Sequence, residues 1–199
     1  MPRAKEFDPD GAVDAAMRVF WEKGYQGTSA QDLCDCTGLG RSSIYATFAS
    51  KRALYLRALR RYDAIMAERR EALLTSQAPL ADRLRTVLTS VIDDELGDGP
   101  HGCFALNAAV EFGGRDAQVT ELAEGSFQRL RTALRGAITV ARAAGELCTD
   151  ADPAALADHV HCSMNGLRIM ARTTRDRARL TSVRDTILAT LPWAADRAS

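Results

Sequence analysis

The chain has 199 residues, of which 46% are hydrophobic and 26% charged, as is typical of soluble globular proteins. Basic and acidic residues number 26 each, so the net charge is zero and any DNA-binding charge must be local. Five cysteines without Cys-x-x-Cys spacing predict free thiols in a reducing compartment. Because no apolar stretch is long enough for a signal peptide or a membrane span, we expect a cytoplasmic protein with no membrane partner. No cofactor is expected.

The first two helices are predicted from their end signals. Asp8 and Pro9 form an N-cap followed by proline at the first helical position, and Gly24 is expected to end this helix. Thr28 is expected to cap the second helix, with Gln31 completing a capping box three residues later.

A glycine-bearing turn follows the second helix. The sequence Thr-Gly-Leu-Gly at 37–40 separates it from a short third helix over 41–48, which carries Ile44 and Phe48 inward. Helix, four-residue turn and helix form the arrangement in which a second helix enters the major groove of DNA.

Helical periodicity continues to the end of the chain, and strict strand-like alternation is absent. We therefore predict an all-α protein of about nine helices. An N-terminal three-helix DNA-binding domain is expected at 1–50, followed by a second helical domain at 51–199. The six later helices are expected near 51–76, 80–96, 103–113, 117–145, 153–174 and 177–191.

A local basic excess accompanies the turn. Residues 38–62 contain six basic residues and no acid, a pattern typical of phosphate contact, although a solvated basic helix face would give it too. The third helix adds short hydrogen-bonding side chains suited to base edges and phosphates. The six basic residues are Arg41, Lys51, Arg52, Arg57, Arg60 and Arg61.

Residues 28–56 resemble the helix-turn-helix signature of the TetR family. The resemblance rests on Thr-Gly-Leu-Gly followed by Ile-Tyr-x-x-Phe-x-x-Lys-x-x-Leu, and on the upstream Phe20-x-x-x-Gly24-Tyr25-x-x-Thr28. Two departures are Gly40, at a position where a serine or threonine N-cap is common, and Ala46, where a larger residue is common.

The resemblance implies a homodimeric transcription regulator, expected to be a repressor, that binds palindromic double-stranded operator DNA. It also implies that residues 51–199 form a ligand-sensing and dimerisation domain that binds a small-molecule effector. It places Arg41, Ser42, Ser43 and Thr47 in the groove, and Thr28, Tyr45 and Lys51 on phosphates.

The helix near 153–174 is apolar on two sides. Ala157, Val160, Met164, Leu167 and Ala171 repeat every three or four residues, and the other side carries Ala155, Cys162, Gly166 and Ile169. The first seam fits either a monomer core or a dimer interface, and the resemblance favours the interface. The predicted interface residues are Val160, Met164, Leu167, Ala171, Val183, Ile187 and Leu191.

A ligand site is expected in the second domain. Phenylalanine side chains provide apolar contact area, and a few polar or reactive groups can orient a ligand. This combination favours an uncharged, largely apolar effector. Cys103, at a predicted helix N-terminus, is either a redox sensor, a pocket residue or an inert core thiol. The predicted lining residues are Cys103, Phe104, Asn107, Phe112, Phe127 and Met164.

Two further functions are considered. A thiol-dependent enzyme would use Cys103 with His101, but no third orienting group is evident, so we predict that the chain is not an enzyme. A metal-sensing regulator would use His159 and Cys162, which share a helix face, with a third ligand from elsewhere. We predict that no metal is bound.

Overall fold

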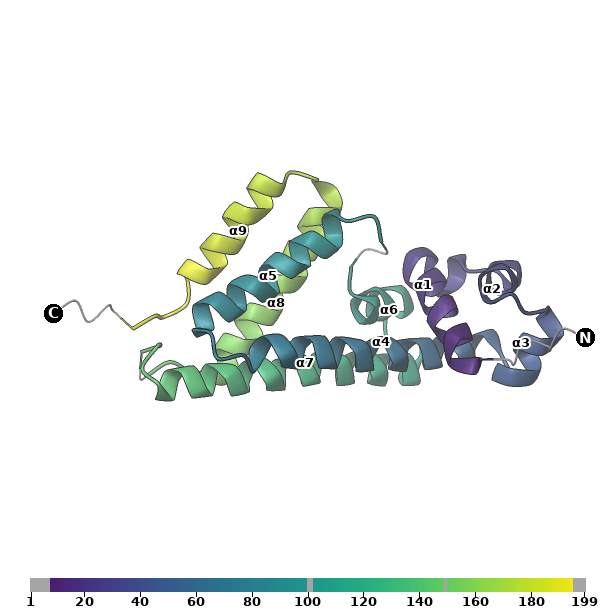
Figure 1. Cartoon of the computed structure of the whole chain (residues 1–199), viewed down its shortest axis with the longest axis horizontal. Coiled ribbons are helices and arrows are strands. Elements are labelled where there is room, and N and C mark those ends of the chain that lie inside the picture. The colour runs from purple at the N-terminus through teal and green to yellow at the C-terminus, as the bar shows by residue number, and fades with distance from the viewer. Residues whose placement is uncertain (1–7, 100–101, 149, 195–199) are drawn as a thin grey trace, which may run out of the picture. The chain divides into compact units, whose positions relative to one another are not determined.

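The computed structural model describes residues 8–99, 102–148 and 150–194. Over these ranges the chain forms nine α-helices, and the only β pairing is an isolated bridge between Leu147 and Trp193 (Figure 1). The predicted all-α class is therefore confirmed. The helices are α1 Pro9–Gly27, α2 Ala30–Thr37, α3 Arg41–Phe48, α4 Lys51–Leu74, α5 Leu80–Leu96, α6 Phe104–Phe112, α7 Ala117–Ala143, α8 Pro153–Thr173 and α9 Arg177–Ala189.

The helix ends follow local chemistry, with one correction. Asp8 caps α1 by accepting a hydrogen bond from the backbone N–H of Asp10, and Gly24 interrupts the helix with φ 74° before a last turn to Gly27. The capping box of α2 uses Ser29 and Asp32, not Thr28 and Gln31 as expected. The cap lies one residue later than predicted because the Thr28 hydroxyl donates to the Gly24 carbonyl at the kink.

The chain packs as two units. The N-terminal unit comprises the chain through Ile65 together with Cys103–Glu124, and the C-terminal unit comprises Met66–Gly102 and the chain from Gly125 onwards. Helices α4 and α7 each run from one unit into the other. These are units of packing; the expected functional boundary at residue 50 remains a prediction.

Aromatic side chains fill the centre of the N-terminal unit. The Tyr55 ring lies 5.0 Å from that of Phe20 and 5.4 Å from that of Phe104, in edge-to-face geometry that stabilises such pairs. Tyr62 and Trp21 extend the cluster, with ring centroids 4.9 Å apart. Helix α1 contacts both α2 and α6, so this core supports the helix-turn-helix directly.

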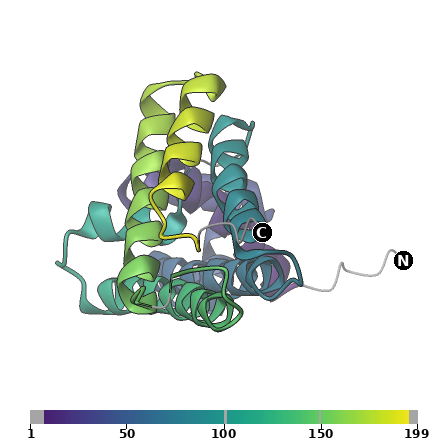
Figure 2. The same cartoon turned by 90° about the vertical axis from the view of Figure 1, so that its left-hand side faces the viewer.

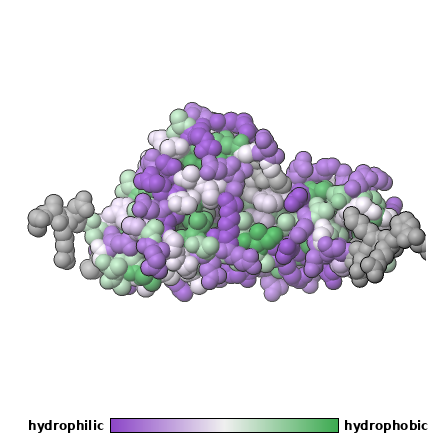
Figure 3. All heavy atoms as spheres, viewed as in Figure 1, coloured by the Kyte–Doolittle hydropathy of each residue, from purple (hydrophilic) through white to green (hydrophobic). Residues whose placement is uncertain are grey.

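The C-terminal unit is built around α5, which contacts both α8 and α9 (Figure 2). Its apolar core also takes side chains from α4 and α7, including the fully buried Leu134 and Ile138. Polar residues cover most of the face seen in Figure 3, and apolar ones form small separate groups there. No helix among the described residues is long and apolar enough to cross a membrane.

Candidate functional site

The turn between α2 and α3 is held by backbone geometry. Gly38 adopts the left-handed conformation (φ 69°) and donates its N–H to the carbonyl of Cys34 at 2.9 Å, which ends α2. Gly40 caps α3 without any side-chain hydrogen bond. Leu33 of α2 and Ile44 of α3 are buried, so the two helices are held by one small core.

Burial of one side of α3 leaves its N-terminal end open to solvent. Arg41, Ser42 and Ser43 are exposed, whereas Tyr45 and Thr47 are half-buried. The Arg41 guanidinium lies 5.8 Å from the centre of the Tyr45 ring. The end of α3 therefore presents one cation and two hydroxyl groups, a set that can bond base edges and phosphates.

The basic segment splits into paired and unpaired residues. Arg52 forms two hydrogen bonds with Asp116, at 2.7 and 2.8 Å, and Arg61 pairs with Asp14. Lys51 lies 4.5 Å from the Tyr25 ring centre, and burial lowers its pKa. Of the six, Arg41, Lys51, Arg57 and Arg60 form no ion pair with an acid in the described chain.

Thr28 does not fit its predicted role. Its side chain is buried, and its hydroxyl already donates to the Gly24 carbonyl at 2.6 Å. The side chain therefore has no surface to offer a phosphate in this arrangement. The exposed neighbour at this helix start is Ser29, whose hydroxyl bonds Asp32.

Glu111 of α6 joins that helix to the DNA-binding motif. Its two carboxylate oxygens accept the backbone N–H groups of Tyr25 and Gln26, at 2.9 and 2.7 Å. The left-handed Gly24 makes room, because an added Cβ there would lie 3.0 Å from a Glu111 oxygen. Sequence analysis missed this residue, since 85 positions separate Gln26 from Glu111 and no local pattern connects them.

The six predicted ligand-lining residues fall into both units. Cys103 is buried at the N-cap of α6, Phe104 and Phe112 pack against Tyr55, and Asn107 is half-buried on α6. These four belong to the N-terminal unit. In the C-terminal unit, Phe127 lies against His161 with ring centroids 5.3 Å apart, and Met164 is buried in the apolar core.

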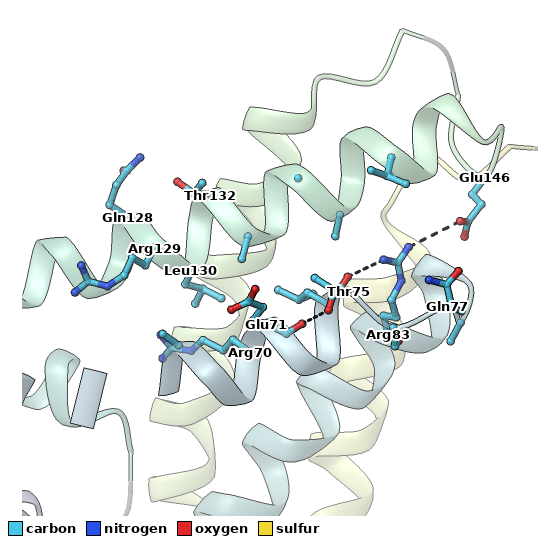
Figure 4. Close-up of a pocket in the computed structure, with 18 residues that line it drawn as sticks. Arg70, Glu71, Thr75, Gln77, Arg83, Gln128, Arg129, Leu130, Thr132 and Glu146 are labelled. Carbon is cyan, nitrogen blue, oxygen red and sulfur yellow. Dashed lines mark hydrogen bonds and ion pairs between the residues drawn. The ribbon is translucent and has the colours of Figure 1, made fainter. Parts of the chain in front are cut away.

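A groove of about 780 Å³ lies in the C-terminal unit between the second half of α4 and α7 (Figure 4). Its volume is in the usual range for small-molecule sites. Arg83 and Glu146 lie at one end, and Arg70 and Arg129 at the other. None of the six predicted ligand residues lines this groove.

The predicted dimer residues of α8 lie inside the chain's own core. Val160, Met164, Leu167 and Ala171 are each at most 3% exposed. Of the other three, Leu191 is also buried, and Val183 and Ile187 pack half-buried against the same core. Because core side chains cannot also cover a partner, the interface assignment to the buried positions requires correction. The opposite side of α8, with Ala155, Cys162, Gly166 and Ile169, is exposed.

The residues considered for a metal site or for an enzyme do not form an assembled site in the described part of the chain. Among the described residues no three His, Cys, Asp or Glu side chains are grouped to hold a metal. His159 instead bonds Thr190 of the segment after α9 at 3.1 Å. His101, the base of the enzyme alternative, lies outside the described residues. All five cysteines are free thiols.

Known proteins match the chain over almost its full length. Residues 12–58 match the bacterial regulatory proteins of the tetR family, and residues 66–187 match the tetracyclin repressor-like C-terminal domain. The chain is 33% identical to the uncharacterized HTH-type transcriptional regulator YezE of Bacillus subtilis, covering 96% of this chain and all of that one. It is 29% identical to the HTH-type transcriptional repressor ComR of Escherichia coli, over 96% and 91% of the two chains.

A solved structure agrees with these matches. A cysteine mutant of the TetR family regulator CifR, complexed with 26-base-pair double-strand operator DNA, superposes with a TM-score of 0.85. It is 27% identical over 96% of this chain and all of that chain.

Proposed function

Because the chain belongs to the TetR family of bacterial transcriptional regulators, we propose that it is a cytoplasmic repressor that binds a palindromic operator as a homodimer. A small-molecule or redox signal would release it. The observation that carries the proposal is the exposed end of α3, held on a small buried core beside unpaired basic residues. ComR is named a repressor and CifR was solved on operator DNA, which supports the same role here.

The DNA contacts follow from the exposed face of α3. Arg41 reads a guanine, because an arginine at the start of a recognition helix can form two hydrogen bonds with one guanine edge. Ser42, Ser43 and Thr47 contact neighbouring bases, while Tyr45 and Lys51 hold phosphates. Thr28 contributes by shaping the α1–α2 connection, since its hydroxyl bonds within the chain.

The dimer forms through the exposed side of α8 together with α9. Along this side Ala155, Cys162, Gly166 and Ile169 are spaced by seven, four and three residues, which keeps them on one face. Three of the four are small, so two copies of α8 can approach closely. Ile169, 59% exposed, supplies the large apolar side chain that a partner would cover.

The signal reaches the DNA-binding motif through α6. Two connections join the α6 region to the motif: Glu111 to the α1–α2 turn, and Asp116 to Arg52 at the start of α4. A ligand acts by favouring one arrangement of these connections, and about 1–3 kcal/mol of differential binding is typical of such coupling.

Cys103 begins the same helix, so a Cys103→Ser variant separates two kinds of signal. A redox mechanism predicts a variant that binds operator but no longer responds to hydrogen peroxide. A response equal to that of the parent protein would leave Cys103 with a packing role alone.

Selection of bound DNA from a random pool tests the proposal most directly. The full-length protein should enrich one palindrome, because a two-fold dimer presents two copies of α3. Mutating Arg41 to alanine should relax one position in each half-site. If no sequence is enriched over the starting pool, the chain is not an operator-binding repressor.

A further inference from the structure

Arg168 of α8 is a largely buried cation with no counter-ion among the residues that the structure describes. Its side chain is 8% exposed, and it forms no hydrogen bond or ion pair with any residue that the structure describes. The other buried arginine, Arg83, donates to the Leu74 carbonyl at 2.7 Å and lies 4.0 Å from a Glu146 oxygen. The Arg168 nitrogens are not among the fully buried polar atoms, so the guanidinium still reaches solvent and is open to an anion.

Two polar side chains share that side of α8. His161, Asn165 and Arg168 are spaced by four and three residues, which places them on one face of the helix. The His161 Nε2 and the Asn165 amide nitrogen lie 3.2 Å apart. Phe127 of α7 adds an apolar wall against the His161 ring.

The charges around this face are mostly positive. Burial lowers the pKa of His161 below its usual value, and the positive charges of Arg70, Arg131 and Arg168 lower it further. Asp158 is the one acid that opposes them, and Arg131 already binds it at 2.7 Å. Arg70 also lines the end of the groove seen in Figure 4, and it has no ion pair within the described chain. The face therefore combines a neutral imidazole with uncompensated positive charge.

We propose that His161, Asn165 and Arg168 bind the carboxylate group of an apolar organic acid, and that this acid is the effector of the repressor. The guanidinium offers a fork of N–H donors that matches a carboxylate, and the imidazole and amide each keep a donor for it. Phe127 contacts the apolar part of the acid. This effector is an anion, in contrast to the uncharged molecule that the sequence favoured. Its role as effector rests on the proposed function; the binding itself does not.

Thermal unfolding of the full-length protein tests the binding. Acetate, benzoate and decanoate are the probes, and benzyl alcohol is the neutral counterpart of benzoate. We expect benzoate or decanoate to raise the melting temperature, because a ligand of the folded state stabilises it, and benzyl alcohol to leave it unchanged. Calorimetric titration should show binding to the parent protein that is about tenfold to a hundredfold weaker in Arg168→Met, as loss of a charged hydrogen bond predicts.

Arg168→Met has a second expected effect that needs no ligand. Replacing an unpaired buried cation by an apolar side chain of similar length should raise the melting temperature by about 2–4 °C. Arg135→Met, which removes an exposed arginine of α7, should change neither the stability nor the response to carboxylates. A lower melting temperature in Arg168→Met would make Arg168 a structural residue and overturn the proposal. So would a failure of all three carboxylates to bind.

Operator affinity without any acid is measured separately, by fluorescence anisotropy of labelled selected DNA. Benzoate or decanoate should then release the parent protein but not Arg168→Met. If the protein binds carboxylates through Arg168 yet binds no operator, the proposed function fails while the site stands. If operator binding is normal and no carboxylate binds, the function stands and the site fails.

Discussion

The two units differ in whether their partly buried charged groups have hydrogen-bond partners. In the N-terminal unit the Glu111 carboxylate accepts two backbone N–H groups of the α1–α2 turn, and the Asp116 carboxylate accepts two hydrogen bonds from Arg52. Among the described residues of the C-terminal unit, Arg168 forms no hydrogen bond or ion pair, and the Nε of Arg83 and the Oγ of Ser126 are buried without a hydrogen bond. The described part of the N-terminal unit has one such atom, the uncharged hydroxyl of Tyr55.

This difference corresponds to two tasks. A unit that must present α3 in one fixed geometry is stabilised by hydrogen-bonded carboxylates, because these help to specify a single arrangement. The C-terminal unit, which we propose responds to a ligand, keeps buried polar groups without hydrogen bonds, at a cost in stability of the free protein. Each variant below changes one unit, and the measurement shows whether folding stability, dimerisation or operator binding is affected.

The largest effects are expected on α8, where two sides of one helix serve different purposes. Leu167→Glu places a charge in the core and should cost about 4 kcal/mol or more of folding stability. Ile169→Glu, two residues away on the exposed side, should leave the fold intact but yield a monomer with weak operator binding. Circular dichroism and sedimentation separate the two results. A dimeric Ile169→Glu protein would place the interface on another surface.

Next in size is the connection through Glu111. Glu111→Ala leaves two backbone N–H groups of the α1–α2 turn without their acceptor, which should lower the free energy of unfolding by about 2–4 kcal/mol. Denaturant titration measures this, with Glu121→Ala on exposed α7 surface as the matched control. Equal stability of the two variants would mean that Glu111 does not hold the turn.

A smaller effect is expected at the DNA surface, without loss of stability. Arg41→Ala should cost about 1–3 kcal/mol of operator affinity and lose preference at one base of each half-site. Lys51→Ala should instead weaken binding to all sequences alike and reduce the salt dependence by about one unit of slope. Affinity measured on base-substituted operators at several salt concentrations distinguishes the two. A selected motif unchanged by Arg41→Ala would assign base reading to Ser42, Ser43 or Thr47.

The smallest effect concerns pH and the Arg52–Asp116 pair. Hydrogen bonding to Arg52 lowers the pKa of Asp116 to about 2, below the usual value of about 3.9. A depressed folded-state pKa contributes stability that is present above the unfolded value and is lost as the pH falls from about 4 towards 2. Arg52→Gln should therefore flatten the stability profile in that window, as measured by thermal unfolding. A profile identical to that of the parent protein would show that the pair adds nothing.

Features that depend on short stretches of sequence were predictable. Asp8 with Pro9 marked the start of α1, and the glycines at 38 and 40 marked the turn of the DNA-binding motif. These signals are local, because capping and left-handed turns involve residues a few positions apart. The one-residue error at Thr28 arose because its hydroxyl had two possible local roles: to accept a backbone N–H as the cap of α2, or to donate to the Gly24 carbonyl, which is the role it takes.

Tertiary structure alone decided which of several equivalent patterns faces the core. Both sides of α8 carry apolar residues at helical spacing, and only packing against α5 shows that Leu167 is inside while Ile169 is outside. The partners of Glu111 and the isolation of Arg168 follow from contacts between distant parts of the chain, which no periodicity encodes. The helical segments and the DNA-binding motif were set by neighbouring residues. The buried side of α8, the α6 connection and the surroundings of Arg168 were set by burial, because burial depends on every element packed around a side chain.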